Sequence, residues 1–162
     1  ADMRMSGYPA KIKSFAWVGS APYLTTSGAE EAVCWPFDSK DGPMGRPPIT
    51  CAYGGKQLCT SVAGLVNHDA VFAGFEDGSV IASRLTTTQK IEDFIVKGRS
   101  RSPIASMALT SEGWLFVGVE EYEEYTARPD EDGKMKDVED GVPDDVIEEG
   151  TMFEDNIAEF GE

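Results

Sequence analysis

Short apolar segments separated by turn-forming residues fill the chain up to about residue 119. The pattern is clearest at residues 59–65, 70–75, 79–85 and 91–96, each rich in β-branched, aromatic or small apolar side chains. Asn67-His68-Asp69 and Glu76-Asp77-Gly78, which favour turns, lie between the first three segments. Four short strands joined by turns are typical of one antiparallel sheet. We therefore predict an all-β fold.

Two further units carry the same pattern. Residues 12–18, 23–27, 32–37 and 48–53 form a second set of four predicted strands, with a turn-rich segment from Asp38 to Pro47 between the last two. Residues 104–109 and 114–119 form two more predicted strands before the composition changes. No long stretch with helical periodicity precedes residue 120.

The three units are related in sequence. Residues 12–17 (IKSFAW), 59–64 (CTSVAG) and 104–109 (IASMAL) align on Ser14, Ser61 and Ser106, at spacings of 47 and 45 residues. A second marker, a glycine followed two residues later by glutamate, occurs at 28, 74 and 118, at spacings of 46 and 44. Repeats of about 40 to 45 residues are typical of β-propeller blades.

These residues resemble the WD-repeat family of β-propellers, whose blades carry an Asp-Gly turn and a strand that ends near a tryptophan. Residues 77–80 (DGSV) match the turn, and Val33-Cys34-Trp35 matches the tryptophan strand. The chain departs from the pattern where Pro36 replaces the aspartate after the tryptophan and Ser83 replaces a second tryptophan. The resemblance implies four-stranded antiparallel blades that hold protein partners. A β-sandwich or another repeat class is the alternative.

We divide the chain into an N-terminal arm (1–10), blades at 11–56 and 57–100, a partial blade at 101–119 and an acidic tail (120–162). About two and a half blades are too few for a closed propeller, which has about four to eight. The chain is then a fragment of a longer propeller, an oligomer whose copies complete one another, or a piece inserted beside a partner.

The net charge of −15 arises entirely from the tail. Residues 1–119 contain equal numbers of acidic and basic residues, whereas 120–162 contain 18 acidic residues against Arg128, Lys134 and Lys136. Such a composition predicts a mostly disordered segment. Near its end, Thr151 and Glu154 form a possible capping box for a short helix at 152–160. Phe153, Ile157 and Phe160 would share one face of this helix and could dock on the blades or on a partner.

The sequence contains no recognised catalytic pattern. It has no nucleophile motif or phosphate-binding loop, and Cys51, Cys59 and His68 lack zinc-site spacing. We expect no enzyme activity, metal or cofactor. The odd number of cysteines, Cys34, Cys51 and Cys59, predicts free buried thiols. Trp17, Trp35 and Trp114 fall in predicted strands, where we expect them to pack in the core.

We therefore predict a cytoplasmic, non-catalytic WD-repeat-like scaffold that mediates protein–protein interaction. Nucleic acid is an unfavourable partner because the tail repels phosphate, and no segment predicts membrane insertion. In the alternative, the tail binds a basic partner, as a nucleic-acid mimic or an autoinhibitory segment. The candidate partner-binding residues lie in four loops: Asp38, Asp41, Arg46, Asn67, His68, Asp69, Glu76, Asp77, Lys97, Arg99 and Arg101.

Overall fold

The computed structural model describes residues 2–86, 92–120, 127–129 and 135–137. All strands in these residues belong to antiparallel sheets, as the sequence predicts. Within the same residues no helix has the length and apolar character needed to cross a membrane.

Sheet 1 has the strand order β1-β2-β3-β4, which is also the chain order. Its strands are β1 (Phe15–Val18), β2 (Tyr23–Thr26), β3 (Ala32–Pro36) and β4 (Ile49–Cys51). Sheet 2 repeats this order with β5 (Cys59–Gly64), β6 (Ala70–Phe75), β7 (Val80–Arg84) and β8 (Asp93–Lys97). Sheet 3 pairs β9 (Ile104–Leu109) with β10 (Leu115–Val119).

The ten predicted strands up to residue 119 are all present, and β6 and β9 have the predicted bounds. Other strands are shorter, for local reasons. The first begins at Phe15 and not at residue 12, because the amides of Lys13 and Ser14 donate to the Ser27 hydroxyl at 3.1 and 3.0 Å. The fourth ends at Cys51 because Ala52 has a left-handed φ of 57°, which interrupts an extended strand.

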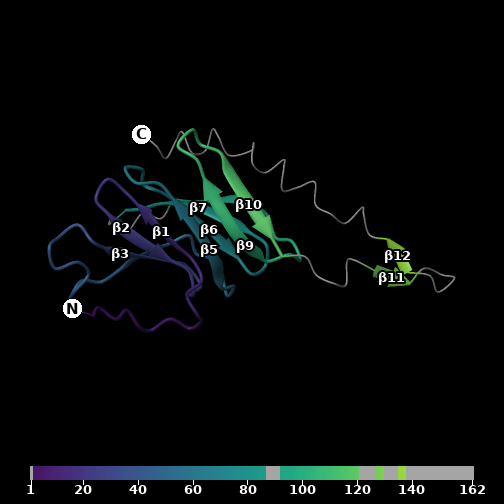
Figure 1. Cartoon of the computed structure of the whole chain (residues 1–162), viewed down its shortest axis with the longest axis horizontal. Coiled ribbons are helices and arrows are strands. Elements are labelled where there is room, and N and C mark those ends of the chain that lie inside the picture. The colour runs from purple at the N-terminus through teal and green to yellow at the C-terminus, as the bar shows by residue number, and fades with distance from the viewer. Residues whose placement is uncertain (1, 87–91, 121–126, 130–134, 138–162) are drawn as a thin grey trace.

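The three sheets stack in chain order, with sheet 2 between sheets 1 and 3 (Figure 1). One apolar cluster joins Val18, Ala32 and Cys34 of sheet 1 to Val71 and Phe75 of sheet 2. A second cluster joins the opposite face of sheet 2 to sheet 3. Its members are Ala63, Ala70, Phe72, Val80, Ala82, Val96, Ile104, Leu115 and Val117. Both faces of sheet 2 are thus covered, which is why every residue of β6 is buried.

Close approach between the sheets depends on small residues. A Cβ at Gly64 in β5 would overlap the Val18 side chain of sheet 1, and one at Gly74 in β6 would overlap Ile104 of sheet 3. The first strands of the sheets also lie side by side, since β1 contacts β5 and β5 contacts β9. The Ser14 hydroxyl adds a polar link, accepting the Val62 amide at 3.0 Å.

Among the few described residues of the tail, one feature was not predicted. Two short strands, β11 (Ala127–Pro129) and β12 (Met135–Asp137), pair antiparallel within the region expected to be mostly disordered. The predicted helix at 152–160 and its docking residues Phe153, Ile157 and Phe160 lie outside the described residues.

Candidate interaction surfaces

The predicted partner-binding residues fall at two opposite ends of the sheets. Successive strands run in opposite directions, so alternate loops share an end. The loops at 37–48 and 65–69 lie at one end, which we call the Arg46 end. The loops at 76–79 and 98–103 lie at the other, the Asp77 end. The partner-binding residues predicted from the sequence therefore belong to two separate surfaces.

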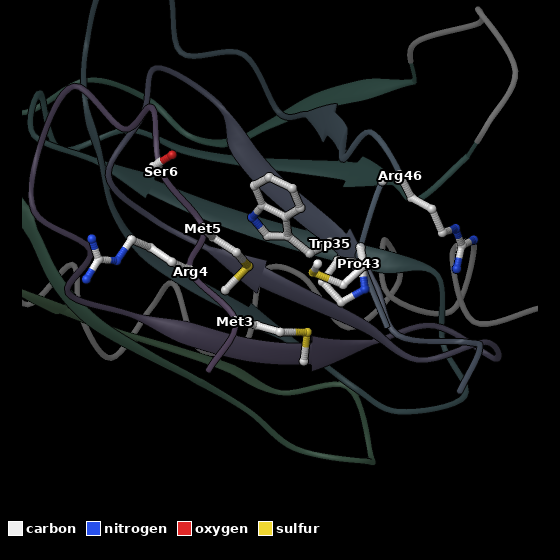
Figure 2. A pocket seen from close by; sticks show the side chains of 9 residues that line it. Met3, Arg4, Met5, Ser6, Trp35, Pro43 and Arg46 are labelled. Atoms are coloured by element: carbon white, nitrogen blue, oxygen red, sulfur yellow. The ribbon is translucent and has the colours of Figure 1, made fainter. Parts of the chain in front are cut away.

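A hollow of about 270 Å³ opens beside the β3–β4 loop at the Arg46 end. Its lining comes from the N-terminal arm and from that loop, with Trp35 of β3 between them (Figure 2). The apolar side chains that line the hollow are Met3, Met5, Trp35, Pro43 and Met44. The Arg4 and Arg46 side chains lie on opposite sides of this hollow in the same view. The arrangement is an adaptable apolar surface flanked by positive charge.

A chain of hydrogen bonds holds the arm on sheet 1. The Trp35 indole N–H donates to the Tyr8 hydroxyl at 2.6 Å, and the Tyr8 and Thr26 hydroxyl oxygens are 2.5 Å apart. Thr26 in turn donates to the Val33 carbonyl at 3.2 Å, so its oxygen is left to accept from Tyr8. Tyr8 thereby positions the arm residues that form one wall of the hollow.

Arg46 separates this hollow from a second one. The second hollow, of about 510 Å³, is lined by Tyr23, Ile49, Thr86 and residues of the β3–β4 loop. The Arg46 guanidinium pairs with Asp38 across the loop, and both side chains are about one-third exposed. This hydrogen bond holds the pKa of the Asp38 carboxyl below its ordinary value. Asp41, also predicted, is exposed in the same loop.

The predicted Asn67-His68-Asp69 segment joins the sheets through its backbone. Gly19, which follows β1, donates to the His68 carbonyl at 2.8 Å and accepts from the Asn67 amide at 2.9 Å. The Asp69 carbonyl accepts from Leu85 at 2.7 Å. Asn67 takes the left-handed conformation, with φ of 70°, which asparagine tolerates better than most residues. These contacts indicate a structural role for the turn.

At the other end, Asp77 organises the turn between β6 and β7. Its Oδ1 accepts the Ser79 amide at 3.0 Å and the Ser79 hydroxyl at 2.6 Å. Its Oδ2 lies 3.2 Å from the Arg99 Nε in the loop after β8, and its carbonyl accepts the Ser100 amide at 2.8 Å. The Asp77 carboxylate therefore connects the β6–β7 turn to the loop after β8.

The remaining predicted residues at the Asp77 end are less closely grouped. Glu76 is exposed, and its carboxylate accepts the Leu58 amide at 3.2 Å. Lys97 is half-buried at the end of β8, and Arg101 is exposed in the following loop. No cavity among the described pockets includes these three side chains.

The three cysteines are free and buried, as predicted. All three belong to the cluster between sheets 1 and 2. The Cys34 sulfur is 3.2 Å from the Thr25 hydroxyl. A hydrogen bond with Cys34, together with burial, raises the pKa of the Cys51 thiol well above its ordinary value, and burial raises the pKa of Cys59 to about 12. Cys51 and Cys59 are therefore neutral, inaccessible thiols, which are poor nucleophiles, whereas the hydrogen bond with Cys51 lowers the pKa of Cys34.

The tryptophan prediction is wrong for Trp17. It is half exposed on the outer face of sheet 1, where its ring meets Phe37 edge-on with centroids 5.3 Å apart. Trp35 and Trp114 are half-buried, and Trp35 lines the hollow instead of filling the core. Sequence reasoning also missed the arm residues Met3 and Met5. The density of methionines before residue 6 was the available signal.

Among the described residues, no three His, Cys, Asp or Glu side chains converge as a metal site would require. Comparison with known proteins adds no relative: no family model matches the chain, and neither do the curated proteins or the solved structures.

Proposed function

We propose that this chain is a non-catalytic β-propeller-type scaffold that binds a protein partner at the Arg46 end. Two features support the propeller arrangement. The sheets stack face to face, and each is built outward in chain order from a first strand that contacts the first strand of the next sheet. Propeller blades share this layout, in which first strands surround the axis.

The observation that carries the binding proposal is the exposed methionine-rich hollow. Met44 is 65% exposed at its edge, and Met3 and Trp35 also line it. Exposed apolar groups gathered at a concave surface are typical of protein-binding sites. Arg4 favours an acidic group, whereas the Arg46 charge is already paired with Asp38, so the best-fitting partner presents an apolar side chain beside a carboxylate.

The experiment compares Met44→Glu with Ile95→Glu by quantitative affinity capture. Ile95 in β8 is 78% exposed and lies outside the hollow, so its substitution controls for added surface charge. Met44→Glu places a charged group in the apolar lining of the hollow, and it should reduce capture of a specific partner at least tenfold. The partner is then purified and titrated against both variants. Equal affinity for both would contradict the proposal.

The charge distribution favours a second candidate function, in which residues 120–162 bind a basic partner. Eighteen acidic residues in this segment produce a strong field beside a neutral body. The test replaces Asp by Asn and Glu by Gln throughout the segment of the full chain. If the tail carries binding, the neutralised chain loses the partner, and wild-type binding weakens steeply as salt is raised. Binding unchanged by neutralisation would assign the function to the sheets.

A further inference from the structure

The hairpins β5–β6 and β9–β10 have the same structure. Ser61 faces Gly74 in the first, and Ser106 faces Gly118 in the second. In each, one extra residue follows the first residue of the leading strand, at Thr60 and Ala105, and shifts the register there. The backbone hydrogen bonds next to these bulges also correspond. The Glu76 amide donates to the Leu58 carbonyl at 3.0 Å, and the Glu120 amide donates to the Pro103 carbonyl at 2.9 Å.

The two hairpins differ in what lies at their second edge. In sheet 2, β6 pairs on that side with β7, from Gly74 opposite Val80 to Ala70 opposite Arg84. In sheet 3, β10 pairs with β9 alone among the described strands. The backbone groups along this edge of β10 form a template for an added strand.

The outer face of the β9–β10 hairpin is likewise left uncovered by the described strands. Phe72 of β6 is fully buried because sheet 3 covers it. Its counterpart Phe116, on the face of β10 directed away from sheet 2, is 51% exposed. The inward residues Leu115 and Val117 are buried against sheet 2, so the hairpin is well packed on that side, although no other described strand covers its edge or outer face.

We infer that the free edge of β10 binds one extended strand of another polypeptide, antiparallel and in the register that β7 takes on β6. This surface is distinct from the Met-rich hollow and does not depend on it. The partner segment supplies the backbone groups that β7 supplies in sheet 2. Main-chain hydrogen bonds provide the affinity, and alternate side chains provide the specificity.

The equivalence with β7 defines the chemistry of the incoming segment. Ile81 lies opposite Ala73, whose counterpart is Val117, so a bulky apolar residue is expected there and would pack on sheet 2. Ala82 lies opposite Phe72, so a small residue is expected opposite Phe116. The segment is therefore about five residues long, apolar at its start and small at its centre.

A single strand fits this edge better than a second copy of the chain. Sheet 2 has four strands against the two of sheet 3, so β7 and β8 extend beyond β10 in the underlying layer. If two copies paired through β10, each would bring its own sheet 2 into the layer that the other already fills. An isolated extended segment has no second layer and avoids this collision.

The probe is a fluorescent peptide with the sequence of residues 78–85 (GSVIASRL). This peptide contains β7, the strand that pairs with β6 in sheet 2. It is titrated into the full chain by anisotropy, with amide hydrogen exchange measured in parallel. The control peptide carries proline at the positions of Ile81 and Ala82. Adjacent residues direct their N–H groups to opposite sides, so one substitution must remove a donor from the β10 side.

We expect saturable binding of the first peptide, at least tenfold weaker binding of the proline peptide, and slower exchange confined to residues 115–119. Three results would overturn the inference: no saturable binding, equal binding of both peptides, or protection at β8 instead of β10. A concentration-dependent dimer that protects 115–119 without peptide would also overturn it, in favour of self-pairing. Met44→Glu should leave peptide binding unchanged, which separates this test from that of the hollow.

Discussion

Gly74 of β6 lies directly against the Ile104 side chain of β9, so closely that a Cβ at position 74 would overlap it. The two residues belong to different sheets and are brought together only by stacking. Ile104 is 1% exposed at this contact. The absence of a side chain at 74 thus sets the spacing between sheets 2 and 3.

Replacing this glycine should therefore destabilise the stack. We expect Gly74→Ala to reduce the free energy of unfolding by about 1–3 kcal/mol, the usual cost of overpacking a core. Gly98→Ala is the matched control, because a Cβ at 98 meets no heavy atom within 4 Å. Urea denaturation followed by circular dichroism measures both. Equal stability of the two variants would show that the sheets are not packed this closely.

The contact between Gly64 and Val18 predicts coupling between sheets 1 and 2. A Cβ at 64 would overlap the Val18 Cγ1, so Val18→Ala should relieve part of the strain caused by Gly64→Ala. In a double-mutant cycle, the double variant should lose less stability than the two single losses combined, by about 0.5–3 kcal/mol. Strict additivity in chemical denaturation would argue against direct contact.

Asp77 and Arg99 form an ion pair whose two members should contribute very unequally. Asp77 also accepts two hydrogen bonds from Ser79, whereas the Arg99 side chain is 80% exposed. We expect Asp77→Ala to cost about 1.5–3 kcal/mol, as loss of bonds to a charged group does, and Arg99→Ala to cost less than about 1 kcal/mol. Thermal and urea unfolding of the two variants provide the comparison. A larger loss for Arg99→Ala would contradict the proposed role of Asp77.

The raised pKa of Cys59 predicts a loss of stability in alkali. The ordinary pKa of the thiol, 9.0, applies to the unfolded chain, and burial raises the pKa to about 12 in the folded state. Between these values the folded state binds more protons than the unfolded state, so the free energy of unfolding falls as pH rises. One such group contributes a slope of up to about 1.4 kcal/mol per pH unit. Urea unfolding between pH 8 and pH 11 should therefore show a shallower decline for Cys59→Ala, and an unchanged slope would contradict the assignment.

The hydrogen bonds of the Tyr8 hydroxyl predict that its removal loosens the N-terminal arm locally. Tyr8→Phe removes the hydroxyl that joins Trp35 to Thr26, so the arm should detach more often while the sheets remain folded. Trypsin should then cleave faster after Arg4, by roughly tenfold if about 1.4 kcal/mol of local stability is lost. Tyr53→Phe is the control, because the Tyr53 ring is exposed. Mass spectrometry of timed digests measures the rates, and equal rates would show that Tyr8 does not anchor the arm.

The second and third copies of the sequence repeat are structurally equivalent, whereas Ser14 and Gly28 of the first copy lie outside the β1–β2 pairing. Ser61 and Ser106 take the same place opposite a glycine in matching hairpins, as their spacing suggested. Strand bounds were less predictable where a side chain intervened. The Ser27 hydroxyl, which binds the amides of Lys13 and Ser14, delays the start of β1, and a side-chain bond of this kind leaves little trace in hydrophobic periodicity.

The candidate surfaces could also be predicted from the sequence only in part. Turn residues such as Asp77 and Asn67 were recognisable from the sequence, but their carboxylate and backbone groups are used to join loops and sheets. The hollow was not predicted, because its walls come from segments separated by more than thirty residues in the chain.

The sequence by itself determined the short antiparallel strands, the recurring hairpins and the separation of a neutral body from an acidic tail. These depend on local alternation, turn chemistry and charge, which can be read along the chain. Only the tertiary structure decided which loops share an end, that Met3 and Met44 line one hollow, and that β10 pairs with β9 alone among the described strands. Those features depend on how sheets stack, and stacking is set by contacts such as Gly74 against Ile104, between residues distant in sequence.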